Sequence, residues 1–149
     1  MTSVRAARFA AAYALLRAAA DVADHWIQTD HQASTKGHHD HNDGQSSAAG
    51  RRACAAHVAT YTATQAAALL AGSRLLGVRL RPGPVAAALA LSAVTHYIAD
   101  RREPLRRLAD ATGKGTFVRL ADHGMNGAYA LDQAWHHAAE TMAALVASA

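Results

Sequence analysis

Aspartate and histidine residues recur at helical spacing along this chain, and both residue types can bind a divalent metal ion. Five pairs of polar residues are each four positions apart: Asp21/His25, Asp24/Gln28, His57/Tyr61, His96/Asp100 and Asp132/His136. Four positions are about one helical turn, so both members of a pair would lie on one face of a helix. Because imidazole together with carboxylate suits zinc, manganese or iron, the spacing indicates a metal site built from helices.

The surroundings of three of these residues favour a position inside the protein. His57, His96 and Asp132 lie in otherwise apolar stretches, where a polar group is costly unless it is paired, hydrogen-bonded or bound to metal. Helical bundles commonly build such sites in the core from facing helices. We therefore expect one shared centre, in which the same six residues are metal ligands and catalytic residues: Asp24, His57, His96, Asp100, Asp132 and His136.

The leading hypothesis for this centre is a metal-dependent hydrolase that acts on a phosphate-containing small molecule or lipid. A divalent ion would lower the pKa of a bound water, which would attack the substrate. Gln28, Lys36 and Arg101 are expected near the mouth as substrate-binding residues, where Lys36 or Arg101 would neutralise a phosphate. The alternative is a non-enzymatic helical binding or membrane-associated protein, in which the same groups form a buried hydrogen-bond network.

The elements that must position these residues are expected to be helices. Alanine, the best helix former, supplies 40 of the 149 residues. We predict a single all-α domain over residues 1–149, a compact bundle of four main helices plus one short helix. The main helices are expected at about 3–28, 51–76, from after Pro84 to about 102, and from 128 to the end, with the short one at 104–111. Much of the burial is expected from the few large residues, among them Leu15, Leu16, Trp26, Tyr61, Leu69, Leu70, Tyr97, Ile98 and Trp135.

Two segments differ in composition from these helices. Residues 30–50 are rich in histidine, glycine and serine and are expected to be a solvated, mobile loop insertion that could capture metals loosely. Residues 112–127 contain four glycines and are expected to be a functional loop.

Charge, cysteine content and motifs exclude several functions. The formal charge is +4 with 13 arginines and two lysines, which gives a weak attraction to phosphate groups or anionic lipid. Nucleic acid is an unlikely partner, because no recognition motif accompanies the arginines. The single cysteine, Cys54, excludes an internal disulfide and a multi-cysteine zinc site. A phosphate-binding loop at Gly113–Thr116 is excluded because Leu108 stands where its first glycine is needed.

Two stretches approach the length of a membrane span. Residues 53–73 and 82–99 contain no Asp, Glu, Lys or Arg, and a span needs about 20 residues. Alanine contributes almost nothing to insertion, however. We therefore expect a cytoplasmic protein, with peripheral membrane association and homo-oligomerisation left open.

These residues resemble the bacterial and phage family called domain of unknown function 3307. The resemblance lies in the segments 22–33 with Lys36–Gly37, 56–61, 94–102 and 131–136, and so includes all four predicted main helices. Family members often carry a histidine four residues before the first motif aspartate, where this chain has Ala20; Asp21 or His25 would have to substitute. The resemblance implies a shared polar core and an association with membranes, without a defined reaction.

Overall fold

The protein folds into a helical bundle, as its composition predicts. The computed structural model describes residues 2–149. Within this range the elements are α1 (Thr2–Val22), a π-helical turn η1 (Ala23–Ile27), α2 (Asp30–Thr35), α3 (Ser47–Leu75), α4 (Pro82–Asp100), α5 (Glu103–Ala111), α6 (Gly115–Val118), strands β1 (Ala121–Asp122) and β2 (Met125–Asn126), and α7 (Gly127–Ala147). The all-α fold class is therefore confirmed.

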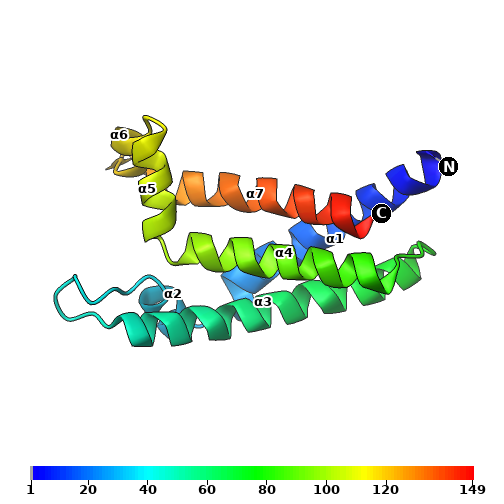
Figure 1. Cartoon of the computed structure of the whole chain (residues 1–149), viewed down its shortest axis with the longest axis horizontal. Coiled ribbons are helices and arrows are strands. Elements are labelled where there is room, and N and C mark those ends of the chain that lie inside the picture. Colours follow the sequence, from blue (N-terminus) through cyan, green and yellow to red (C-terminus); the bar gives the residue numbers. More distant parts are fainter. Residues whose placement is uncertain (1) are drawn as a thin grey trace.

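Four long helices form the body of the molecule. α4 packs against α7 and α3, and α1 packs against α3 and α7, so the four helices surround one interior. They lie side by side along the long axis (Figure 1). The short elements α2, α5 and α6 gather at one end of the bundle, and the two chain termini lie at the other. We call these the cavity end and the terminal end.

The terminal end is packed by small apolar side chains. Its core consists mostly of alanines from α1, α4 and α7, together with Leu16 and Leu69. Alanine buries little area per residue, so the helices must approach closely to exclude water. At Gly72 of α3 an added Cβ would collide with the Leu15 side chain of α1, which shows how close these two helices are.

Several large residues that were expected in the core lie on the surface instead. Trp26 is 85% exposed, Leu70 55% and Ile98 40%. For Trp26 the reason is local, because α1 ends at Val22 and the wider π-helical turn changes the direction of the side chains that follow.

The two segments predicted as loops contain more regular structure than expected. Thr29 and Gln32 form a capping box that starts α2, and Ser46 caps α3. The loop between these helices is anchored by Arg101, which donates hydrogen bonds to backbone oxygens of Lys36 (2.5 Å) and His38 (2.6 Å). The prediction of a mobile insertion over 30–50 is therefore wrong for its helical ends. The segment 112–127 likewise contains α6 and the hairpin β1–β2.

Candidate metal centre

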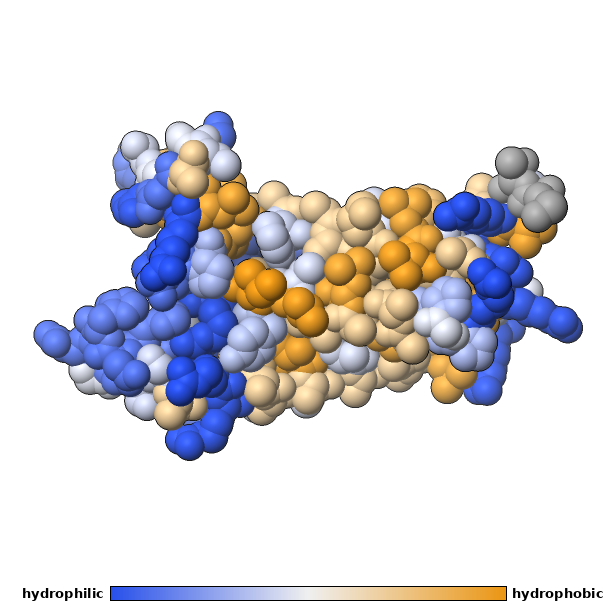
Figure 2. Space-filling view, viewed as in Figure 1, coloured by the Kyte–Doolittle hydropathy of each residue, from blue (hydrophilic) through white to orange (hydrophobic). Residues whose placement is uncertain are grey.

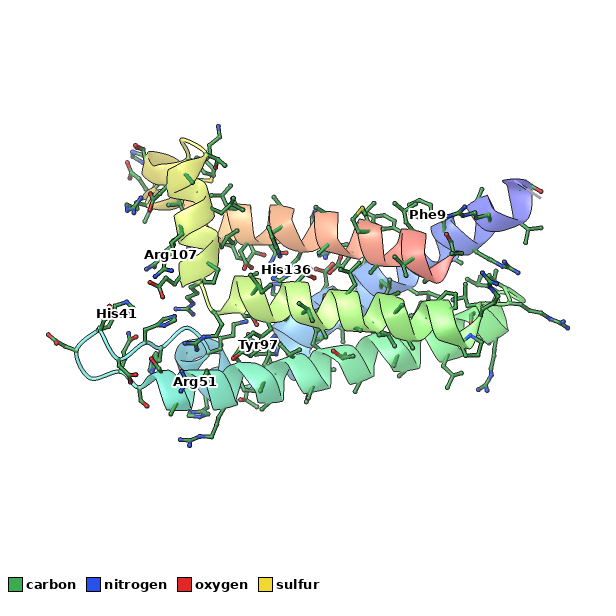
Figure 3. All side chains as sticks on the ribbon, viewed as in Figure 1. Phe9, His41, Arg51, Tyr97, Arg107 and His136 are labelled. Atoms are coloured by element: carbon green, nitrogen blue, oxygen red, sulfur yellow. The ribbon has the colours of Figure 1, made fainter. Side chains whose placement is uncertain are left out.

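The structure brings all six predicted ligands together in the cavity-end half of the bundle. Asp24 comes from η1, His57 from α3, His96 and Asp100 from α4, and Asp132 and His136 from α7. The spacing of four residues places His57/Tyr61, His96/Asp100 and Asp132/His136 on inward faces, whereas Asp21 and His25 are exposed. The side chains of His57, His96, Asp100 and His136 are buried, whereas Asp24 and Asp132 are partly exposed. Figure 3 shows His136 pointing from α7 towards α4.

The centre of this group is a pair of imidazoles flanked by two carboxylates. The Nε2 atoms of His57 and His96 lie 2.9 Å apart. Asp100 Oδ2 lies 3.4 Å and 3.2 Å from these two atoms, and Asp24 Oδ1 lies 3.1 Å and 3.5 Å from them. Ligand atoms around a tetrahedral ion with bonds of about 2.0–2.1 Å are about 3.3 Å from one another. The separations therefore match those of a metal coordination sphere.

Unpaired polar atoms at this point support the same interpretation. Asp100 Oδ2 is buried and accepts no hydrogen bond from residues 2–149. Buried polar groups without a partner are rare in folded proteins, so each one calls for an explanation such as a bound ion. The Nδ1 atoms of His57 and His96 also lack a partner in the described chain. The contacts of both rings are thus made through the Nε2 atoms, which face each other.

A second set of ligand atoms adjoins the first. Asp100, Asp132 and His136 each offer an atom within 4.8 Å of the others, and so do Asp24, His96 and His136. The His136 ring stacks on that of His96, with centroids 4.4 Å apart. Because Asp100 belongs to both sets, the cluster has donors for one ion or for two that share this carboxylate.

Lys36 lies beside the centre, where it contacts a carboxylate. Its Nζ atom lies 2.8 Å from Asp100 Oδ1, so its positive charge is paired with that carboxylate. At Asp24, burial favours a higher pKa, but the contact with His57 and the nearby His96 and His136 outweigh it. The pKa of Asp24 therefore lies below its ordinary value, and the carboxylate is ionised near neutral pH.

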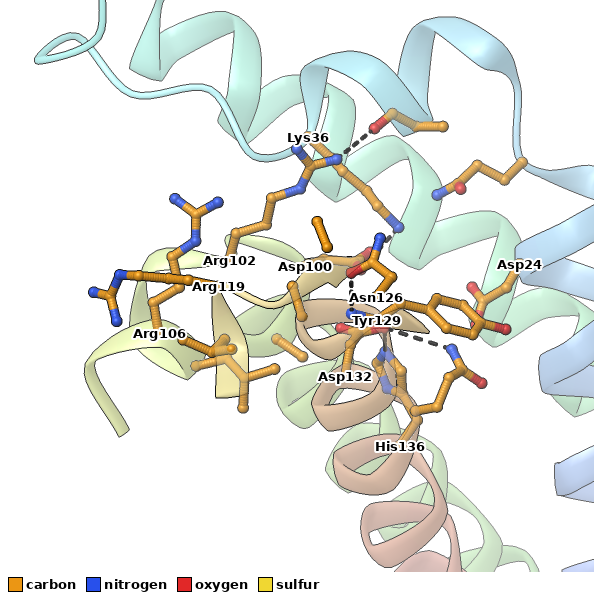
Figure 4. A pocket seen from close by; sticks show the side chains of 18 of the residues that line it. Asp24, Lys36, Asp100, Arg102, Arg106, Arg119, Asn126, Tyr129, Asp132 and His136 are labelled. Carbon is orange, nitrogen blue, oxygen red and sulfur yellow. Dashed lines mark hydrogen bonds and ion pairs between the residues drawn. The ribbon is translucent and has the colours of Figure 1, made fainter. Parts of the chain in front are cut away.

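A cavity of about 840 Å³ opens from this centre towards solvent. Asp24, Asp100, Asp132 and His136 are among its lining residues, and Gln28 and Lys36 lie at its side as predicted. Figure 4 shows the carboxylates and His136 together with the cations that surround them.

The arginines of this cavity differ from the predicted one. Arg101 is not among its lining residues and is buried against the loop that it anchors, so its prediction as a substrate-binding residue is wrong. Its neighbour Arg102 lines the cavity instead, together with Arg106 and Arg119 (Figure 4). Arg102 reaches the cavity because its backbone adopts a positive φ of 61° where α4 turns into α5. Asp110 holds the Arg119 guanidinium through two contacts, of 2.6 and 3.0 Å.

A second buried polar cluster lies next to the centre and was missed in the sequence. Tyr61 donates to Glu140 Oε1 at 2.9 Å, and Arg17 donates to Glu140 Oε2 at 2.6 Å. Gln65 donates to the Tyr61 hydroxyl and accepts from Ser92. The Tyr61 ring also stacks on that of His96, with centroids 3.8 Å apart. One further step of four residues from His136 would have identified Glu140.

The remaining histidines lie outside the centre. His25 lines the cavity, and its Nδ1 atom lies 2.9 Å from the backbone oxygen of Asp21. His39 and His41 form a separate surface group with Glu103.

Comparisons with known proteins add no further assignment. No family model, no curated protein sequence and no solved structure matches this chain. The resemblance to the domain of unknown function 3307 family therefore remains an expectation from the sequence.

Proposed function

We propose that this protein is a metal-dependent hydrolase whose His/Asp centre holds one or two divalent ions of zinc, manganese or iron. One observation carries the proposal. The Nε2 atoms of His57 and His96 lie 2.9 Å apart, and one carboxylate oxygen of Asp24 and one of Asp100 each lie 3.1–3.5 Å from both nitrogens. The Asp100 oxygen, Oδ2, is buried and accepts no hydrogen bond from residues 2–149. This donor set suits the proposed ions.

The chemistry follows from the positions of the chain's own residues. A divalent ion supplies Lewis acidity and lowers the pKa of a coordinated water. Asp24, His57, His96 and Asp100 would hold the ion. Asp132 and His136, whose Oδ2 and Nε2 atoms are 3.4 Å apart, line the cavity beside it. In this position they would accept the proton released from the attacking water or hold a second ion.

The substrate that this cavity favours carries a phosphate group. Arg102, Arg106 and Arg119 line the cavity, and the guanidinium group matches phosphate oxygens in geometry and charge. Lys36 and Arg119 are less suited to this role, because they already contact the carboxylates of Asp100 and Asp110. We propose a phosphoester of a small molecule in the cytoplasm, or of a lipid at a membrane, as the substrate class.

The experiment measures metal binding and hydrolysis by the same protein. Chelator-treated full chain is titrated with zinc, manganese or iron(II) and assayed with bis(p-nitrophenyl) phosphate, p-nitrophenyl phosphate and phospholipid in mixed micelles. Activity should appear with metal and fall at least a hundredfold in His57→Ala. The variant Asp122→Asn, at an exposed site in β1, should leave the activity unchanged. Binding of less than a tenth of an equivalent, without stabilisation by added zinc or manganese, would contradict the proposal.

The second candidate function is a non-enzymatic binding protein with a polar core. The observation in its favour is the hydrogen-bond network around Glu140, which satisfies Tyr61, Gln65 and Ser92 without an ion. Such networks rigidify a core. If His96→Ala and Asp132→Ala lower the stability but bind as much metal as the parent chain, this second function is favoured.

A further inference from the structure

The outward faces of α3 and α4 carry no charged side chain over most of their length. Residues 53–73 and 82–99 contain no Asp, Glu, Lys or Arg. In α7, Glu140 is buried and Asp132 lines the cavity. On α1, Arg17 contacts both Asp21 and Glu140, so its charge is balanced within the bundle. The surface helix of a water-soluble protein normally has charged and polar residues on its outer face, so this arrangement requires another explanation.

Large apolar side chains occupy these outward faces. Leu70 of α3, Val94 of α4, and Met142 and Leu145 of α7 are all exposed, with Val94 at 59%. On the face shown in Figure 2, apolar residues cover most of the middle of the molecule and hydrophilic residues gather at both ends. We call this surface the apolar belt and define it as the outward faces of residues 53–73, 82–98 and 130–145. A contiguous apolar surface of this kind marks a site of interaction.

The length and exposure of α4 identify what covers the belt. α4 has 19 residues with a mean hydropathy of 1.2 and is the helix in the described chain that is long and apolar enough to cross a membrane. At 1.5 Å per residue it is about 28 Å long, close to the hydrocarbon thickness of about 30 Å. Only 22% of its apolar 18-residue stretch is buried, whereas the apolar core helix of a water-soluble protein would be mostly buried.

Arginines border the belt at both ends. Arg74, Arg79 and Arg81 lie at the terminal end, around the turn between α3 and α4, and Arg51 and Arg52 lie at the start of α3 on the cavity end. Arginine at such positions complements anionic lipid headgroups.

We propose that the apolar belt is embedded in the hydrocarbon layer of a lipid bilayer, so that α4 crosses this layer with the outward faces of α3 and α7 beside it, and the cavity opens at one headgroup layer. The interior agrees with this placement, because ionisable residues of membrane helices face the bundle interior. Threonine hydroxyl groups on the belt also donate hydrogen bonds to the backbone of their own helix, so they need no water as a partner. Thr62 donates to the backbone oxygen of Val58 at 2.7 Å, and Thr64 donates to that of Thr60 at 2.8 Å.

The first test uses the full chain and a pair of charge substitutions. Val94→Lys puts a charge near the middle of the belt, whereas Leu75→Lys puts one at the terminal end, next to Arg74. We expect the parent chain and Leu75→Lys to remain in membranes after high-salt and alkaline carbonate washes, and Val94→Lys to lose at least nine-tenths of its membrane-bound amount. Equal retention of both variants would contradict the proposal.

A second measurement does not depend on how well Val94→Lys folds. A Val94→Trp chain with the native tryptophans changed to phenylalanine is reconstituted in vesicles of phosphatidylcholine and phosphatidylglycerol. Lipids brominated near the bilayer centre should quench its fluorescence more than twofold. Absence of quenching would overturn the proposal, and so would a detergent-free soluble dimer that Val94→Lys converts to monomers, because a second copy would then cover the belt. His57→Ala should remain in the membrane, so failure of the proposed hydrolase activity would leave this inference standing.

Discussion

Replacing Asp100 with asparagine should remove most of the stabilisation that zinc gives to this protein. The change keeps the size of the side chain but removes the charge of the carboxylate that faces both Nε2 atoms, at 3.4 Å and 3.2 Å. A ligand that binds only the folded state, at a hundred times its Kd, stabilises that state by about 2.7 kcal/mol. For a chain of 149 residues, 1 kcal/mol corresponds to about 2–4 °C in Tm. Zinc should therefore raise the Tm of the parent chain by about 5–11 °C.

The variant should respond far less to the same zinc concentration. If the affinity falls by about a hundredfold, that concentration equals the new Kd, and the gain is about 0.4 kcal/mol, or about 1–2 °C. Asparagine also leaves Lys36 without its partner, but each protein is compared with its own metal-free form, so this loss does not enter the difference.

The assay is thermal unfolding in detergent solution, followed by circular dichroism with and without zinc. Asp122→Asn makes the same chemical change at an exposed site outside the cluster and should keep the full shift. Equal shifts in the two variants, or no shift in the parent chain, would refute the assignment of Asp100 as a ligand.

Three further predictions test other parts of the structure. Tyr61→Phe removes the donor to a buried oxygen of Glu140 and should lower the free energy of unfolding by about 1–3 kcal/mol in denaturant titrations; an unchanged midpoint would contradict the role of this network. Gly127→Ala places a Cβ against the backbone of α6 and should cost about 1–3 kcal/mol, whereas Gly83→Ala, which meets no atom within 4 Å, should not be destabilising. The low pKa of Asp24 means that its contribution to stability is present above the unfolded-state value of about 3.9 and is lost as the pH falls through the lower folded-state pKa. The stability difference between the metal-free parent chain and Asp24→Asn should therefore shrink as the pH falls below about 4, and a difference that grew over that range would contradict the sign of this shift.

The sequence predicts the helices and the six clustered residues because both depend on local rules. Alanine favours helix at almost every position, and the four-residue spacing determines which side chains share a face. His57 and His96 stand out because polar groups are costly in apolar stretches. The starts of α2 and α3 were also predictable, since Thr29, Gln32 and Ser46 are ordinary capping residues.

The surroundings of the cluster were less predictable because they depend on tertiary contacts. Whether Arg101 or Arg102 lines the cavity depends on the positive φ of Arg102 where α4 turns into α5. No local sequence pattern predicts this backbone conformation. The exposure of Trp26 depends on a π-helical turn that the helical periodicity does not reveal. A hydrophobic residue is assigned to the core by default, and that default is unreliable if lipid surrounds the bundle.

The Asp100–Lys36 contact has a consequence for the number of ions that the centre can hold. Three carboxylates, Asp24, Asp100 and Asp132, face a single ammonium group, so with neutral imidazoles the centre has an excess of two negative charges. One divalent ion makes it electroneutral, which is the condition under which a low-dielectric interior holds charge at least cost. Electroneutrality thus predicts that the centre itself holds one divalent ion when no ligand is bound.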